Sequence, residues 1–357
     1  MGRLALAAGT VWRRAAAREL RSVMRDVSPD IVHFHNTFPL ISPAAYYAVA
    51  AEGLPVVQTL PNFRLLCAKA TFFRDGSVCE DCMGRHLPLA AIRHACYRGS
   101  AAASAAVGTM QVVHRMLGTW RRKVDCFLVP SDFVRNKFIE AGFEQDQVVV
   151  KFNLTEDQGN WQRTNHRQGA LFVGRLSEEK GLHTLMSAWK GIPTCLDVLG
   201  DGPLEASLKR EAPNNVRFLG ATPRSQVINA LRETQFLVVP SEWYETFGLV
   251  IIEAFSVGTP VIVSRLAAPE EIVDDGLTGL HFSPGDPDDL AAKVGWATTH
   301  PEEMRRMGAA AREVYEERYT PDKNYTQLIS IYLDVINGSG HRQKNRTKGT
   351  KERVEGI

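Results

Sequence analysis

The sequence predicts an α/β protein with two domains, and three observations support that prediction. The 357 residues are 44% hydrophobic and 23% charged, which is an ordinary globular composition at a length that suits about two domains. Short apolar runs alternate with helical segments along the chain, as in parallel sheets covered by helices. A polar stretch with two glycines at 156–169 separates two blocks of this kind, so we expect two Rossmann-like domains.

The first block, residues 1–160, is expected to form the first domain. Residues 4–27 have the pattern of a helix, and short apolar runs that end in polar loops follow it. We expect strands in these runs, at 30–36 (DIVHFHN), 54–60 (LPVVQTL) and 125–131 (DCFLVPS). A cysteine-rich insert at 67–96 separates the second of these strands from the third.

The second block, residues 166–320, repeats the pattern more regularly. We expect its strands at 169–175 (GALFVGR), 194–200 (TCLDVLG), 215–220 (NVRFLG), 235–241 (QFLVVPS) and 259–264 (TPVIVS). A helix is expected at 321–337, returning to the first domain. The basic residues 338–357 are expected to form a disordered tail.

Neither a membrane-spanning segment nor an export signal is expected. No apolar run approaches the roughly 20 residues that a helix needs to cross a bilayer. The opening MGRLALAAGTVWRR has a short apolar run, but paired arginines follow it instead of a cleavage site with small residues. We therefore expect a cytoplasmic protein.

Charge is distributed unevenly along the chain, although the net charge is only +2. Basic residues outnumber acidic ones in residues 1–165, and acidic residues outnumber basic ones in 166–337. One interpretation is a basic face that rests peripherally on the anionic inner face of a membrane or meets an acidic substrate. The other is an ordinary solvated surface. A nucleic-acid partner is not expected.

The stretch SEWYETFGLVIIEAFSVGTPVIVS, residues 241–264, contains two acids around a glycine. Glu245 is expected in a loop that follows a strand, Gly248 at the start of a helix that ends near residue 257, and Glu253 within that helix. The two carboxylates are then separated by roughly 8 to 10 Å.

The start of this helix is suited to bind a diphosphate. The free N–H groups at Phe247, Gly248 and Leu249 and the positive end of the helix dipole attract anions, and glycine permits close approach. One carboxylate can accept hydrogen bonds from sugar hydroxyls at one end of such a ligand, and the other from ribose hydroxyls. The pattern therefore predicts a nucleotide-sugar site.

A second stretch, ALFVGRLSEEKGL at 170–182, supports this interpretation. It delivers Gly174, Arg175 and Lys180 to the carboxyl end of a strand, where open α/β sheets bind their ligands. Either cation alone could be an ordinary surface charge. Together with the two acids, they favour an anion site in the same crevice.

Four motifs resemble the donor domain of the family-4 retaining glycosyltransferases, which have the GT-B fold. They are GRLSEEKGL at 174–182, GDGP at 200–203, FLG at 218–220 and ETFGLVIIEAFSVGTPVI at 245–262. The resemblance covers about residues 28–336. It implies two Rossmann-like domains facing across a cleft, with the donor in the second domain and the acceptor in the first.

The resemblance also implies an activity and roles for individual residues. Arg175 and Lys180 match the residues that bind the donor diphosphate, Glu245 matches the acid that contacts the transferred sugar, and Glu253 matches the acid that holds the ribose. Leu219 lies where the base is read. The implied reaction moves a sugar from a UDP- or GDP-linked donor to a sugar or lipid-linked acceptor, with retention and without a catalytic metal, in bacterial cell-surface polysaccharide or glycolipid synthesis.

Two departures from the family pattern concern the first domain. The strand and glycine-rich loop with which the family begins have no counterpart here, so we expect a truncated or misannotated start. In TLPNFRLLC, Pro61 stands where family members usually have a reaction-centre histidine. His35 is the remaining candidate catalytic residue, and it could equally be a structural residue. The alternative function is therefore a catalytically impaired remnant that binds nucleotide sugar without transferring it.

Four cysteines are concentrated in the insert, and they include a CxxC pair. They are Cys67, Cys79, Cys82 and Cys96. In a cytosolic protein this grouping favours a structural zinc site, while four reduced thiols and disulfides stay open as alternatives. Cys126 and Cys195 are in apolar runs and are expected in the core.

Overall fold

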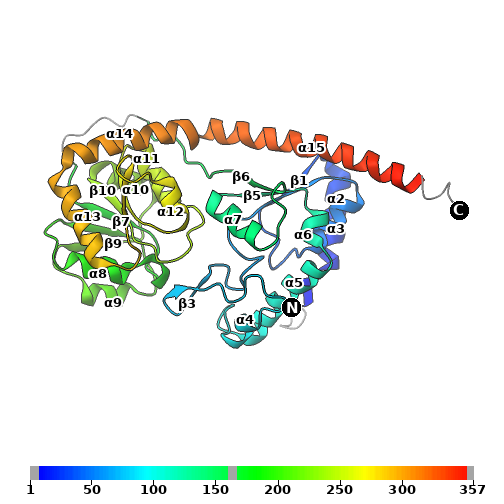
Figure 1. Ribbon diagram of the computed structural model, residues 1–357, viewed down its shortest axis with the longest axis horizontal. Coiled ribbons are helices and arrows are strands. Elements are labelled where there is room, and N and C mark those ends of the chain that lie inside the picture. Colours follow the sequence, from blue (N-terminus) through cyan, green and yellow to red (C-terminus); the bar gives the residue numbers. More distant parts are fainter. Residues whose placement is uncertain (1–7, 160–166, 352–357) are drawn as a thin grey trace.

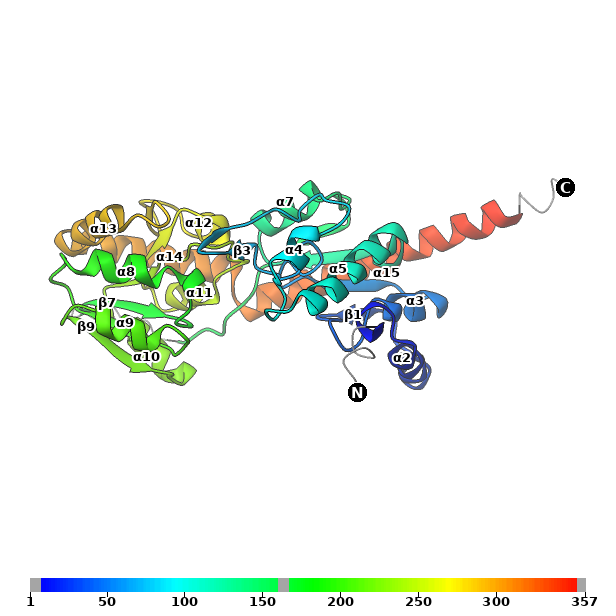
Figure 2. The same cartoon turned by 90° about the horizontal axis from the view of Figure 1, so that it is seen from below.

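The computed structural model describes residues 8–159 and 167–351, with side chains as far as residue 338. Each half of the chain forms its own α/β domain, and the long helix α15 (Pro321–Lys351) runs from the second domain along the first (Figure 1). The view from below shows the two domains side by side along the length of the molecule (Figure 2). The predicted two-domain α/β architecture is confirmed.

The first domain contains a four-stranded parallel sheet. Its order is β1 (Val32–Phe34), β2 (Val56–Thr59), β5 (Cys126–Val129) and β6 (Val148–Val150). The three predicted strands are present, whereas β6 was not predicted because its three valines are fewer than a strand pattern needs. Within the described residues β1 pairs with β2 alone. The expectation that the first strand of the resembling family is missing here stays a prediction.

Helices and a loop-rich insert surround this sheet. The helices are α2 (Arg14–Val27), α3 (Ala44–Ala51), α5 (Ala101–Met116), α6 (Thr119–Lys123) and α7 (Asp132–Glu140). The cysteine-rich insert has only the short hairpin β3 (Phe73–Arg74) and β4 (Ser77–Val78) and the short helix α4 (Leu89–Arg93). In both views the hairpin extends toward the second domain (Figures 1 and 2).

The second domain contains a six-stranded parallel sheet. Its order is β12 (Gly279–Phe282), β11 (Val261–Ser264), β10 (Phe236–Val239), β7 (Ala170–Val173), β8 (Leu196–Leu199) and β9 (Val216–Gly220). The five predicted strands are present. Strand β12 was missed because it begins with a glycine; a Cβ there would lie 2.1 Å from the Val261 carbonyl oxygen, so the close approach to β11 requires glycine.

Helices cover both faces of this sheet, and its central strands are apolar along their length. The helices are η1 (Glu178–Lys180), α8 (Leu182–Trp189), α9 (Glu205–Glu211), α10 (Arg224–Glu233), α11 (Leu249–Ser256), α12 (Ala267–Ile272), α13 (Pro287–Thr299) and α14 (Pro301–Arg318). Val261, Ile262 and Val263 are each 0% exposed although successive side chains point to opposite faces. Such burial on both faces explains why strands were easier to recognise here than in the first domain.

Helix α15 returns to the first domain, as predicted. Gln327 donates to the Val150 carbonyl oxygen at 3.0 Å, and Lys151 Nζ donates to Asn324 Oδ1 at 2.6 Å. The described helix continues to Lys351, so the predicted end at 337 and the disordered tail at 338–351 are corrected. Its glycines weaken a helix by about 1 kcal/mol each but do not stop it as a proline would. Residues 352–357 and most of the predicted linker, 160–166, lie outside the described residues.

One histidine connects α15 to the first sheet and makes this packing sensitive to pH. His33 is hydrogen-bonded to Tyr332 Oη at 2.5 Å and to Thr59 Oγ1 at 2.7 Å. Burial, with smaller contributions from His35 and Lys151, lowers the pKa of His33 to about 4 from 6.5. The folded protein therefore holds this ring neutral at pH values at which the unfolded chain protonates it.

We predict that His33 contributes stability that is complete above pH 6.5 and is lost as the pH falls toward 4. Thermal unfolding measured from pH 7.5 to 4 should show a smaller acid loss in His33→Gln than in the wild type. His86→Gln, at an exposed position, is the control. An equal acid loss in wild type and His33→Gln would contradict this role.

Candidate functional site

The loop after β10 carries a buried acid that forms an ion pair with a cation from another strand. Glu245 is only 8% exposed, accepts a hydrogen bond from Ser241 Oγ at 2.9 Å, and is paired with Lys180 Nζ. Lys180 ends the short helix η1 after β7, and its ammonium lies 5.2 Å from the centre of the Trp243 ring. Two separate strand ends therefore present a carboxylate and an ammonium together, as the sequence led us to expect.

The next residues form the start of helix α11. Gly248 has φ 89°, in the left-handed region that favours glycine, and no side chain caps the helix. Leu249 is half exposed, whereas the Phe247 side chain is 2% exposed and packs in the core. Of the three predicted anion-binding positions, Phe247 can therefore contribute only its backbone. The geometry leaves a helix N-terminus beside the Lys180–Glu245 pair.

Glu253 lies one turn into α11 and has a partner that was not predicted. Its Oε1 is 3.1 Å from Nε of Arg224, and Arg224 also donates to Thr155 Oγ1 at 2.6 Å. Burial raises the pKa of Glu253, and the adjacent guanidinium partly opposes that rise. Arg224 begins α10 just after β9, so the rule that ligands bind at the carboxyl ends of strands could have identified it.

Glycines bring the ends of β7 and β8 into contact. A Cβ on Gly200 would lie 1.9 Å from the Gly174 carbonyl oxygen, and Gly174 N donates to Leu199 O at 3.0 Å. The chain leaves this contact at Arg175, whose exposed side chain makes no hydrogen bond or ion pair with the described residues. At the neighbouring end of β9, Leu219 is 54% exposed. These positions are accessible to a ligand.

The loop that carries Glu245 also touches the first domain. Thr246 Oγ1 donates to the Pro61 carbonyl oxygen at 3.2 Å, and Ser131 Oγ donates to the Thr246 carbonyl oxygen at 3.0 Å. The ring of Tyr244 lies 4.8 Å from that of Phe133, centre to centre. The carboxyl-end loops of the two sheets therefore meet, and the predicted Pro61 segment borders the predicted donor site.

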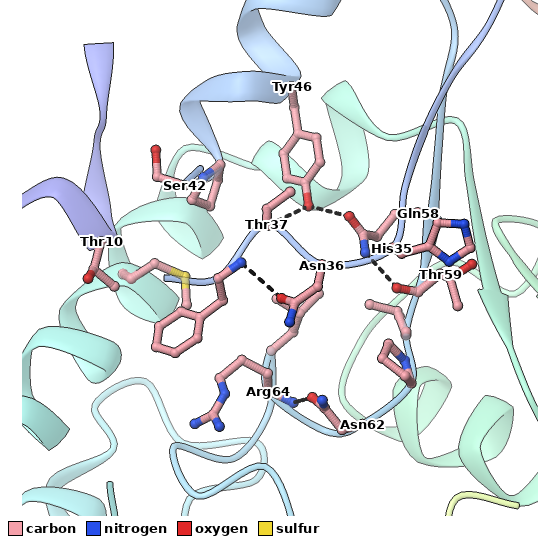
Figure 3. Close-up of a pocket in the computed structure, with 16 residues that line it drawn as sticks. Thr10, His35, Asn36, Thr37, Ser42, Tyr46, Gln58, Thr59, Asn62 and Arg64 are labelled. Atoms are coloured by element: carbon pink, nitrogen blue, oxygen red, sulfur yellow. Dashed lines mark hydrogen bonds between the residues drawn. The ribbon is translucent and has the colours of Figure 1, made fainter. Parts of the chain in front are cut away.

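His35 lines a cavity in the first domain, together with Pro61. The cavity is open to solvent, and both polar and apolar residues line it (Figure 3). His35 is exposed, and its ring stacks on His33 with 4.3 Å between centres. His35 therefore has a structural contact with His33 and also lines the cavity.

The four cysteines of the insert lie around a second cavity of about 320 Å³. Its walls include Cys67, Cys79, Cys82 and Cys96, all of them free thiols. Burial, with the neighbouring thiols as a smaller cause, raises the pKa of Cys82 to about 11. Among the described residues, no group of three or more His, Cys, Asp or Glu side chains has the arrangement needed to hold a metal ion.

Two other expectations concern cysteine burial and membrane spans. Cys126 is buried as predicted. Cys195 is exposed, because it lies just before strand β8 and not within it. Within residues 8–159 and 167–351, no helix combines the length and apolar character needed to cross a membrane.

The second domain matches a known protein family. Residues 155–314 match the family model described as "Glycosyl transferases group 1". The glycogen synthase of Mycobacterium tuberculosis is 30% identical over 183 residues, which are 48% of this chain and 44% of the relative. The phosphatidyl-myo-inositol mannosyltransferase of Mycobacterium leprae is 28% identical over 240 residues, 64% of each protein. The chain thus spans less than two thirds of these relatives.

A likeness to solved structures extends over both domains. The crystal structure of HepE from Anabaena in complex with UDP has a TM-score of 0.68 at 17% identity. The matched region covers 89% of this chain and 82% of the HepE chain. The same protein has also been solved with UDP-glucose. At this identity the likeness shows the fold, and that fold is GT-B.

Proposed function

We propose that this chain transfers a sugar, with retention, from a nucleotide sugar to an acceptor held by the first domain. The match of residues 155–314 to the group 1 glycosyl transferase family supports this proposal. The observation that carries the proposal is the pairing of Lys180 with Glu245 beside the uncapped start of α11. A cation, an acid and free backbone N–H groups at one place suit a sugar joined to a diphosphate.

In this proposal the diphosphate lies between the start of α11 and the two cations. Arg175 and Lys180 balance its charge, and the N–H groups of Gly248 and Leu249 donate to its oxygens. When Lys180 turns to the diphosphate, Glu245 is released to accept hydrogen bonds from the sugar. The same groups stabilise the negative charge that grows on the leaving diphosphate as the sugar–oxygen bond breaks.

The other end of the donor is assigned to Glu253 and Leu219. A carboxylate can accept hydrogen bonds from both ribose hydroxyls, and the Arg224 guanidinium partly opposes the rise in the pKa of Glu253 that burial causes. Leu219 offers an exposed apolar surface to a base at the end of β9. The UDP and UDP-glucose complexes of HepE favour UDP over GDP as the first nucleotide to test.

We predict that Arg175→Ala combined with Lys180→Ala abolishes measurable UDP binding, since two charge-assisted contacts are lost, each contributing about 1.5–3 kcal/mol. Calorimetry with UDP, UDP-glucose and GDP measures the effect. Lys190→Ala with Arg210→Ala, which removes two exposed cations from the same domain, is the matched control. Nucleotide binding that persists in the first variant would rule out this diphosphate site.

A second candidate function is nucleotide-sugar binding without transfer. Pro61 favours it, because a proline stands at the cleft where the resembling family uses a histidine, and only its carbonyl oxygen is engaged, by Thr246. Binding then depends on the second domain alone, whereas transfer also needs an acceptor and a group that assists the reaction.

The two candidates differ in turnover. We predict that the chain hydrolyses or transfers UDP-glucose slowly, that Pro61→His raises the rate, and that His35→Ala lowers kcat while leaving UDP affinity unchanged. Release of UDP, measured with and without a mixture of short oligosaccharides and phosphorylated lipids as acceptors, reports both hydrolysis and transfer. Rapid transfer that is indifferent to both substitutions would show that neither residue assists the reaction.

We also propose that the four insert cysteines bind one structural zinc ion. Thiolates are preferred zinc ligands, and the insert has too little regular structure to build a core of its own. Rotation of the thiol side chains about their Cα–Cβ bonds is needed to bring them onto one ion, and each has three staggered positions available. Reduced thiols and disulfides are the alternatives.

We predict about one zinc per chain in protein purified without chelators, and loss of that zinc together with a lower unfolding temperature after Cys79→Ser. Cys195→Ser, at an exposed site in the other domain, should change neither quantity. Elemental analysis and thermal unfolding are the measurements. Metal-free protein whose thiols are all alkylated without reduction would establish free thiols, and alkylation only after reduction would establish disulfides.

Finally, we propose that the protein is cytoplasmic and that the first domain rests on an anionic membrane surface through the turn between α5 and α6. Met116 and Leu117 are 82% and 47% exposed there, and Arg122 and Lys123 follow on α6. Each cation near anionic lipid contributes about 1 kcal/mol, so attachment should be reversible and weakened by salt.

We predict that co-sedimentation with phosphatidylglycerol vesicles falls as salt is raised from 50 to roughly 500 mM, over which the Debye length shortens severalfold. Arg122→Glu with Lys123→Glu should remove most of the binding at low salt. Lys190→Glu with Arg210→Glu in the second domain is the control and should leave binding unchanged. Binding that ignores both salt and the first substitution would exclude this surface.

A further inference from the structure

The cavity that His35 and Pro61 line in the first domain contains a cation with no acidic partner among the described residues. Arg64 lines this cavity, and no carboxylate of the described residues forms an ion pair with it. Its guanidinium contacts two rings that also contact each other, at 4.8 Å from the centre of Phe38 and 5.0 Å from that of Tyr97. Nη1 donates to the Ala68 carbonyl oxygen. These contacts fix the position of the charge but do not neutralise it.

Two asparagines present further donors to the same cavity (Figure 3). Asn36 Oδ1 accepts a hydrogen bond from Phe38 N at 2.9 Å, and Asn62 Oδ1 accepts one from Arg64 N at 3.0 Å. These hydrogen bonds orient the two amides, and their NH₂ groups can donate to a ligand.

Two acceptor oxygens of the cavity already have partners. Gln58 Oε1 accepts from Tyr46 Oη at 2.7 Å, and Thr59 Oγ1 is bonded to His33 at 2.7 Å. A neutral sugar needs partners for its hydroxyl hydrogens as well as for its oxygens. A phosphate or carboxylate group needs only hydrogen-bond donors. The guanidinium of Arg64 and the NH₂ groups of Asn36 and Asn62 are such donors.

We propose that Asn36, Asn62 and Arg64 bind an anionic group of the acceptor, either a phosphate or a carboxylate. The proposal rests on the proposed glycosyl transfer, and it specifies that reaction's acceptor. It joins the donor site through Pro61, which lines the cavity and also accepts the hydrogen bond from Thr246, next to Glu245. The donor diphosphate has its own cations, Arg175 and Lys180, in the other domain.

The test uses the full chain saturated with UDP and three probes: inorganic phosphate, glucuronate and glucose. We expect phosphate or glucuronate to bind, by calorimetry, at least ten times more tightly than glucose. Asn62→Asp should weaken that binding at least tenfold, because it places a negative charge at the same position. An aspartate keeps the oxygen that accepts from Arg64 N, so folding is expected to persist and is checked by thermal unfolding.

Two further variants separate the charge of Arg64 from its packing. Arg64→Gln should also weaken binding at least tenfold. Arg98→Gln is the matched control, since Arg98 stacks on the same Tyr97 ring at 5.3 Å but does not line the cavity. It should change binding less than twofold. Phosphate binding alone would indicate an acceptor with a phosphate, such as a lipid-linked one, and glucuronate binding alone an acidic sugar.

Other outcomes overturn the inference and can be told apart from failure of the proposed function. If UDP binds but neither anion binds more tightly than glucose, the anion site is wrong and the donor site stands. If Asn62→Asp weakens UDP binding by the same factor as phosphate binding, these residues belong to the donor diphosphate. If UDP itself does not bind to the wild type, the proposed function fails first.

Discussion

Parallel strand direction is the constraint on which the site depends. In a parallel sheet every strand delivers its following loop to the same edge, so residues far apart in sequence become neighbours there. Lys180 follows β7, Glu245 follows β10, and the Lys180–Glu245 pair forms because those two strands are adjacent. Pro61 and Ser131 follow strands of the other sheet and contact Thr246 in the same way. One topological rule therefore assembles both sides of the cleft.

Charge inside the cleft is balanced locally, and that balance prepares the site for a charged ligand. Each buried acid has one basic partner: Lys180 for Glu245 and Arg224 for Glu253. A buried carboxylate left without a partner would destabilise the domain. Arg175 and Arg64 are different, because neither has an acidic partner among the described residues. The unpaired cations thus lie where the two proposed anions, the donor diphosphate and an acceptor group, would bind.

The second domain was more predictable from sequence than the first, for a physical reason. Apart from β9, its strands are buried on both faces, so their composition identified most of them, and the Glu245–Glu253 spacing located the helix start. Arg224 was missed although its position just after β9, at the carboxyl end of a strand, could have identified it. The cavity around Arg64 could not be predicted, since it depends on how loops with little regular structure pack. The prediction of disorder was wrong for residues 338–351, which continue helix α15, because their basic, polar composition is typical of disordered tails.

A crystal structure of the chain with UDP bound tests the central claim most directly. We predict the diphosphate between Arg175, Lys180 and the N–H groups of Gly248 and Leu249, with the ribose hydroxyls on Glu253. Lys180 should have moved from Glu245 toward the phosphates. UDP bound elsewhere, or bound here with the Lys180–Glu245 pair intact and Arg175 still exposed to solvent, would contradict the account.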